Sequence, residues 1–184
     1  DGMGGYKAGE VASGIAVRTV LTLVKEAVDR EDISLSDEVN GLSRPGILLR
    51  DAIQRANKVI FQTAKTQSNC EGMGTTVVAG LFFDDKLTIA HVGDSRMYRC
   101  RDGKLEQVTQ DHSLLQRAAA KNYVTRALGV DPTVDVEITE MPALKDDVYL
   151  LCSDGLSDMV EDDDIQLTIN TFGANLETVA KQLV

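Results

Sequence analysis

Between Thr75 and Val108 the sequence consists of short strand-like runs separated by tight polar turns. Asp84-Asp85 separates the first two runs, and Asp102-Gly103 is a strong hairpin signal because both residue types tolerate left-handed backbone conformations. This alternation predicts an antiparallel meander. Its expected strands are Thr75–Phe83, Leu87–Val92, Met97–Arg101 and Leu105–Val108.

Helical spacing is found on both sides of the meander. Apolar residues recur every three or four positions from Val11 to Val28, which predicts an amphipathic helix. Pro45 can open a second helix, whose apolar face would be Leu49, Ile53, Ala56, Ile60 and Ala64. Further along we expect a short helix at Leu114–Ala120, strands at Val134–Ile138 and Val148–Cys152, and helices at Asp164–Thr171 and Leu176–Val184, with Asn175 as a cap. This order predicts an α+β layered domain.

The composition excludes several classes of protein. The chain has 184 residues, which suits one domain, and a net charge of −10. A nucleic-acid binder or a polybasic membrane anchor would need a basic patch instead. No apolar run approaches the roughly 20 residues of a membrane span. The three cysteines, without a metal-binding spacing, favour a reducing compartment over a disulfide framework.

Two Asp-Gly corners are the strongest candidates for chemistry. Asp1-Gly2 opens a glycine-rich turn, and Asp154-Gly155 ends the apolar run from Val148. Asp111 also stands at the edge of a regular element. Carboxylates and the Gly2 carbonyl are oxygen ligands of the kind that Mg²⁺ and Mn²⁺ prefer. A pair of such ions can activate a water for attack on phosphorus. A simple turn or helix cap at Asp1-Gly2 remains the alternative.

Other polar residues are better explained by structure than by catalysis. An Asp94–Arg96 pair that braces a strand junction is preferred to metal ligation by Asp94. His91 is expected to be packed in the core, whereas His112 could support Asp111 or lie on the surface. The acidic run 161–164 is expected to start a helix. For Asp158 a structural role and a role in metal binding are both left open.

The motifs, taken together, resemble the metal-dependent serine/threonine protein phosphatases of the type 2C family, in their bacterial form. The matching stretches follow the family's order over nearly the whole chain. They are DGMGGYKAGEVAS at 1–13, GMGTTVVAGLF at 72–82, IAHVGDSRMYR at 89–99, VTQDHSLL at 108–115, VTRALG at 124–129 and YLLCSDGLSD at 149–158.

The resemblance implies a four-layer α-β-β-α sandwich of two antiparallel sheets flanked by helices, with two Mg²⁺ or Mn²⁺ ions at one end. Asp1 matches the family's bridging ligand, Gly2 the ligand that binds through its carbonyl, and Asp154 the ligand at the second corner. Asp111 matches a residue that, with Asp154, holds a third, weaker ion. A water that bridges the metals would attack the phosphorus of phosphoserine or phosphothreonine, so that Asp1 and Asp154 act through this water.

The sequence also departs from the family pattern. Met3 stands where eukaryotic relatives have a histidine proposed as the general acid, and Tyr6 replaces a histidine that is common in bacterial relatives. Three features of the family have no counterpart in this sequence. They are the upstream strand with its phosphate-binding arginine, the downstream Asp-Asn corner, and part of the flap. A charged α-amino group beside a bridging carboxylate would repel metal ions. We therefore expect residues 1–184 to be a single catalytic domain that lacks its N-terminal strand, C-terminal strands and part of the flap.

The sequence thus predicts a cytoplasmic, monomeric phosphatase that acts on phosphorylated proteins and opposes a serine/threonine kinase, with no nucleic-acid or membrane partner. The alternative is a catalytically inactive domain of the same fold that binds a regulatory partner. A nucleotide-binding module is a more remote possibility, because no P-loop is found in the sequence.

Overall fold

The computed structural model describes residues 1–3, 6–30, 41–116 and 121–184. Its helices are α1 (Tyr6–Asp29), α2 (Arg44–Thr66), the short 3-10 helix η1 (Ser68–Cys70), α3 (Asp154–Ser157), α4 (Asp162–Phe172) and α5 (Leu176–Leu183). Its strands are β1 (Gly2–Met3), β2 (Gly74–Thr75), β3 (Val77–Phe83), β4 (Lys86–Val92), β5 (Arg96–Arg101), β6 (Lys104–Gln107), β7 (Ser113–Gln116), β8 (Lys121–Val124), β9 (Glu137–Pro142) and β10 (Val148–Cys152).

Two three-stranded antiparallel sheets lie at the centre of the molecule, with strand orders β3-β4-β9 and β10-β5-β6. The β3–β4 hairpin turns at Asp84-Asp85, where φ is 43° and 54°. The β5–β6 hairpin turns at Asp102-Gly103, where φ is 51° and 75°. Positive φ at both central residues matches the right-handed twist of the flanking strands. The predicted meander and its two turns are therefore confirmed.

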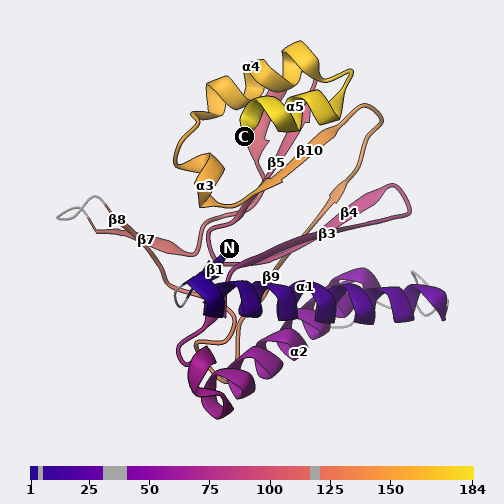
Figure 1. Ribbon diagram of the computed structural model, residues 1–184. Helices are drawn as coiled ribbons and strands as arrows, with labels where there is room; N and C mark the ends of the chain where they lie inside the picture. The colour runs from indigo at the N-terminus through magenta and orange to yellow at the C-terminus, as the bar shows by residue number, and fades with distance from the viewer. Residues whose placement is uncertain (4–5, 31–40, 117–120) are drawn as a thin grey trace.

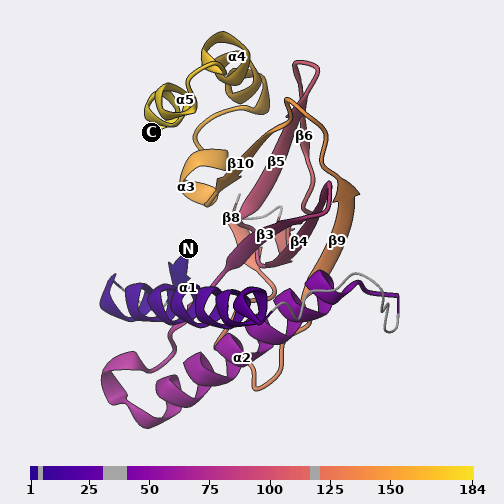
Figure 2. The same ribbon diagram turned by 90° about the vertical axis from the view of Figure 1, so that its right-hand side faces the viewer.

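The two sheets are stacked between two helix pairs (Figures 1 and 2). Alternate residues of β4 point to opposite faces of its sheet. Ala90 and Val92 join the core beneath α1 and α2, whereas Leu87 and Ile89 meet Met97 of the other sheet. A third apolar cluster lies between that second sheet and α4 and α5. The predicted α-β-β-α sandwich is therefore confirmed, with one apolar core at each of its three layer boundaries.

Helix starts follow the capping signals of the sequence. The Ser43 hydroxyl accepts a hydrogen bond from the backbone amide of Gly46 at 3.2 Å, and Pro45 occupies the first turn of α2. The Asn175 side chain caps α5 by accepting from Thr178 N at 3.1 Å, as expected. No helix within the described ranges is both long and apolar enough to cross a membrane.

Three expectations about secondary structure were wrong or displaced. The predicted helix at Leu114–Ala120 is contradicted, because Ser113–Gln116 forms β7 and pairs antiparallel with β8; residues 117–120 lie outside the described part. The strand expected at Val134–Ile138 runs instead over Glu137–Pro142, where β4 supplies a partner. The strand expected at Thr75–Phe83 is split at Thr76, because Gly74–Thr75 pairs with β1 and Val77–Phe83 with β4.

An ion pair ties the β9–β10 connection to β5. Arg101 donates from Nε to Asp147 Oδ1 and from Nη2 to Asp147 Oδ2, both at 2.7 Å. The Tyr149 hydroxyl and the Leu144 amide also donate to Asp147 Oδ2, each at 2.9 Å. The Arg101 guanidinium, followed by these two donors, holds the pKa of Asp147 well below its usual range, even though desolvation opposes the shift.

Replacing Asp147 with Asn should destabilise the fold in a pH-dependent way. A carboxylate with a depressed folded-state pKa contributes stability above its unfolded pKa of about 3.9, and this contribution is lost as the pH falls towards the folded pKa. The stability gap between wild type and Asp147→Asn should therefore be full at neutral pH and narrow below about pH 4. Urea denaturation across this pH range measures it. Asp146→Asn, at an exposed position, is the control, and a gap that stays constant would contradict the prediction.

Ile165 offers a test of the core beneath α4 and α5. Its side chain is 0% exposed, whereas Leu167 on the same helix is 64% exposed. Ile165→Ala should lower the free energy of unfolding by about 2–5 kcal/mol, because it removes buried methylenes and leaves a cavity. Leu167→Ala should change it by less than about 0.5 kcal/mol. Denaturant unfolding of both variants checks this, and equal effects would contradict the layer assignment.

Candidate metal centre

The backbone of Asp1 is held at the junction between β2 and β3. Its carbonyl oxygen accepts from Thr76 N at 2.9 Å and from Thr75 Oγ1 at 2.8 Å. Its α-nitrogen donates to Thr76 Oγ1 at 2.9 Å. Gly2 then pairs with Thr75 as β1 meets β2. The two threonines, which the sequence interpretation did not single out, thus fix the position from which the Asp1 carboxylate projects.

Gly2 lies directly against the first turns of α1. A Cβ atom added to Gly2 would lie 2.1 Å from the carbonyl oxygen of Gly9, and one added to Gly9 would lie 2.6 Å from the carbonyl carbon and oxygen of Gly2. Only glycine at both positions allows this backbone contact. Sequence reasoning missed Gly9, although a glycine inside a helix costs stability and so indicates a close approach.

The second Asp-Gly corner comes from the other sheet. β10 ends at Cys152, and Asp154 begins the short helix α3. Asp1 and Ser153 line the same cavity of about 290 Å³, with Thr76, Ser95 and Cys152 among the other lining residues. The structure therefore brings Asp1 next to Ser153, the residue that directly precedes Asp154, and the Asp154 carboxylate is close enough to interact electrostatically with the Asp1 nitrogen.

Several carboxylates gather at this place. The pKa of Asp94 is raised, first by burial and then by the negative charges of Asp154, Asp111 and Asp158. The Asp154 and Asp94 carboxylates also lie close enough to the Asp1 nitrogen to interact with it electrostatically. Such a set of mutually repelling oxygen donors fits hard divalent cations, which would relieve the repulsion. The donor set therefore fits the ions expected from the sequence.

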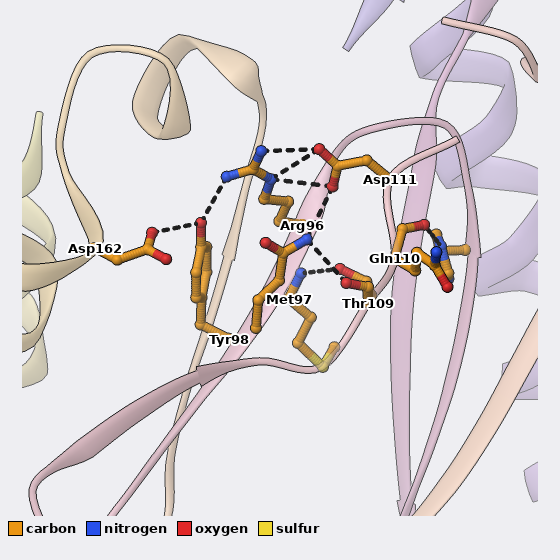
Figure 3. Close-up of polar contacts among 9 residues, drawn as sticks. Arg96, Met97, Tyr98, Thr109, Gln110, Asp111 and Asp162 are labelled. Carbon is orange, nitrogen blue, oxygen red and sulfur yellow. Dashed lines mark hydrogen bonds and ion pairs between the residues drawn. The ribbon is translucent and has the colours of Figure 1, made fainter. Parts of the chain in front are cut away.

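Asp111 is paired with Arg96, as Figure 3 shows. Arg96 Nε lies 3.0 Å from Asp111 Oδ1 and 3.1 Å from Oδ2, and Nη2 donates to Oδ2 at 2.8 Å. Gln107 Nε2 donates to Asp111 Oδ1 at 2.9 Å. The expected Asp94–Arg96 pair is therefore wrong, because the guanidinium reaches across to Asp111. In the described part of the chain Asp94 has no ion-pair partner.

The other end of Arg96 is anchored towards α4. Arg96 Nη1 donates to the Tyr98 hydroxyl at 2.9 Å, and this hydroxyl donates to Asp162 Oδ1 at 3.0 Å (Figure 3). Asp162 belongs to the acidic run, which starts α4 as predicted and thereby supplies a partner for a buried tyrosine. Burial raises the pKa of Tyr98 to about 12, so its hydroxyl keeps its proton at neutral pH.

Two stacked histidines support the turn that carries Asp94. Their ring centroids lie 4.7 Å apart. His91 Nε2 donates to the Gln110 carbonyl at 2.8 Å, and His112 Nδ1 accepts from Gly93 N at 3.2 Å. His112 Nε2 then donates to Glu137 at 3.0 Å. His91 is packed as predicted, and the surface alternative for His112 is excluded by its burial.

These histidines and Glu137 could in principle bind a cation, since their ligand atoms lie within 4.8 Å of one another. Both nitrogens of His112 are already engaged, however, and so is Nε2 of His91. Burial also lowers the pKa of His91, which keeps its ring neutral. We therefore assign this group to holding the Gly93 and Gln110 segments in place beside the carboxylates.

Comparison with known proteins identifies the family. The model of the family described as Protein phosphatase 2C matches residues 1–183. The chain is 37% identical to the serine/threonine phosphatase Stp of Listeria welshimeri over 180 residues, which covers 90% of this chain and 68% of the relative. The chain belongs to the protein phosphatase 2C family.

Solved structures agree with this assignment. The crystal structure of the Mycobacterium tuberculosis serine/threonine phosphatase PstP/Ppp has a TM-score of 0.82 and 33% identity, covering 100% of this chain and 77% of that one. A second structure, the catalytic domain of PstP in complex with two manganese ions, has a TM-score of 0.79 and 33% identity over 100% of this chain and 76% of that one. The family and fold predicted from the motifs are confirmed, and the individual ligand assignments of this phosphatase stay predictions.

The contact between Gly2 and Gly9 can be tested by substitution. Gly9→Ala should push the Gly2 backbone away from its position and weaken Mn²⁺ binding by about ten-fold or more, as partners outside the ligand set commonly do. Gly14→Ala on the same helix is the control, because its Cβ would meet only the Arg18 side chain at 3.7 Å. Calorimetric titration with Mn²⁺ measures both variants. Unchanged affinity in Gly9→Ala would contradict a role in placing Gly2.

Proposed function

We propose that this phosphatase hydrolyses phosphoserine and phosphothreonine on proteins, using two Mg²⁺ or Mn²⁺ ions held by Asp1, Gly2 and Asp154. A third, weaker ion would be held by Asp111 and Asp154. The observation that carries the proposal is that Asp1 shares one cavity with Ser153, the residue directly before Asp154. Beside it lie the carboxylates whose charges, after burial, raise the pKa of Asp94. The relatives from Listeria and Mycobacterium tuberculosis are serine/threonine phosphatases, which supports the substrate class.

The protein's own contribution is position and charge. When bound, the ions supply an activated water and neutralise the charge that develops on the transferred phosphoryl group. Asp1 is held by Thr75 and Thr76, and Asp154 by the junction of β10 and α3. Because both backbones are tied to paired strands, little reorganisation is needed when the substrate phosphate arrives.

The proposed setting follows from the substrate class. A protein phosphatase of this kind acts on phosphorylated proteins, and its cognate partner is a serine/threonine kinase whose products it reverses. We place it in the cytoplasm as a monomer. These assignments rest on the family resemblance and on the net charge of −10, which argues against a basic segment that would bind membranes. A catalytically inactive domain that binds a regulatory partner is the alternative that the following experiment separates.

Asp154→Ala should abolish manganese-dependent hydrolysis of p-nitrophenyl phosphate and of a phosphothreonine peptide. Losing a direct ligand should cost more than the 10–100-fold typical of a partner outside the ligand set, so we expect a fall of more than about 100-fold. Asp163→Ala, at an exposed position in the first turn of α4, should keep its activity and is the control.

Two other outcomes would contradict the proposal. Turnover by Asp154→Ala at saturating Mn²⁺ would remove Asp154 from the ligand set. A folded wild-type protein that binds no Mn²⁺ and shows no manganese-dependent rate would instead favour the inactive regulatory domain.

A further inference from the structure

The Asp111 carboxylate is already fully engaged by protein donors. Arg96 and Gln107 make four contacts of 2.8–3.1 Å to its two oxygens, and a carboxylate offers about four lone-pair positions. Both partners of the ion pair are sheltered, with side-chain exposures of 20% each. Asp111 can therefore bind a metal ion only if it exchanges at least one of these contacts.

Arg96 cannot easily swing into solvent, because it is held from both sides. Its Nη1 atom donates to Tyr98, whose ring is 0% exposed and whose hydroxyl is bonded to Asp162 of α4. An arginine guanidinium stays charged at any working pH. A fixed positive charge thus lies against the carboxylate that is expected to bind the weakest ion.

We propose that Arg96 competes with the third divalent cation for Asp111. The guanidinium serves as a built-in counter-ion that neutralises Asp111 while the cation is absent, and the cation must displace it to bind. The inference rests on the proposed function, because it concerns the third ion of the same centre. It explains in physical terms why this ion is weak: two cations share one carboxylate, and each lowers the affinity of the other.

The competition predicts that the affinity for Mn²⁺ increases when the charge of Arg96 is removed, which a purely structural role of Arg96 would not predict. Arg96→Gln removes the charge and keeps a hydrogen-bond donor for Asp111. It should tighten the weakest phase of Mn²⁺ binding by about ten-fold, a coupling of the usual size between linked sites. Calorimetric titration with Mn²⁺ alone measures this without substrate or turnover.

The chain contains a matched control on the same strand. Arg101 makes a similar bidentate ion pair with Asp147, at 2.7 Å for each contact. Asp147 lies at the β9–β10 connection, however, and not among the carboxylates gathered around Asp94. Arg101→Gln should therefore leave every phase of Mn²⁺ binding unchanged. A similar gain in this control would mean that net charge alone is responsible, and would overturn the proposal.

Further variants separate charge from orientation. Arg96→Lys keeps the positive charge and loses the planar fork, so it should gain much less affinity than Arg96→Gln. The double variant Arg96→Gln with Asp111→Asn should lose the gain, because the shared carboxylate is gone. If Arg96→Gln does not fold, Tyr98→Phe loosens the guanidinium while leaving its charge, and a smaller tightening is expected.

Each result has a distinct meaning. Unchanged or weaker binding of the weakest Mn²⁺ in Arg96→Gln, with the stronger ions still bound, would overturn this inference and leave the proposed function intact. Absence of all Mn²⁺ binding in the folded wild-type protein would instead contradict the proposed function itself, and with it the third ion. A gain confined to Arg96→Gln that is lost in the double variant supports the competition.

Discussion

Burial of the facing sides of the two sheets is the constraint on which the site depends. Leu87 and Ile89 of one sheet pack against Met97 of the other, and this apolar contact fixes how the strand ends meet. Asp1 is then held by the β2–β3 junction, and Asp154 follows β10 of the opposite sheet. Asp1 and Ser153, which are positioned by different sheets, can therefore line one cavity because the sheets are stacked in this way.

The same fold also gathers negative charge at the site and supplies a positive charge that partly neutralises it. Burial, and then the charges of Asp154, Asp111 and Asp158, raise the pKa of Asp94, which is a cost in stability unless cations are supplied. Arg96 supplies one positive charge from within the protein, anchored through Tyr98 to the start of α4. The acidic run of α4 thus does more than favour a helix dipole, because Asp162 completes the chain of hydrogen bonds that leads to Asp111.

Elements with strong local signals could be predicted from the sequence, and weakly marked ones could not. The hairpins at Asp84-Asp85 and Asp102-Gly103 follow from turn chemistry that acts over a few residues. The segment after Ser113 was expected to be helical, yet it forms β7 because β8 provides a partner, and pairing of this kind is not visible in local spacing. β9 was displaced from Val134–Ile138 for a similar reason, since β4 selects Glu137–Pro142.

The sequence by itself determined the family and the layered class of fold, because these depend on motifs and on short-range periodicity, whereas the metal ligands that it indicates stay predictions. Only the tertiary structure decided that Arg96 pairs with Asp111 and not with Asp94, and that Gly9 lies against Gly2. Both contacts join segments whose separation in space is set by packing of α1 and the two sheets. Asp1-Gly2 is accordingly recognisable from sequence as a candidate ligand pair, while the contacts that hold it there appear only in the folded chain.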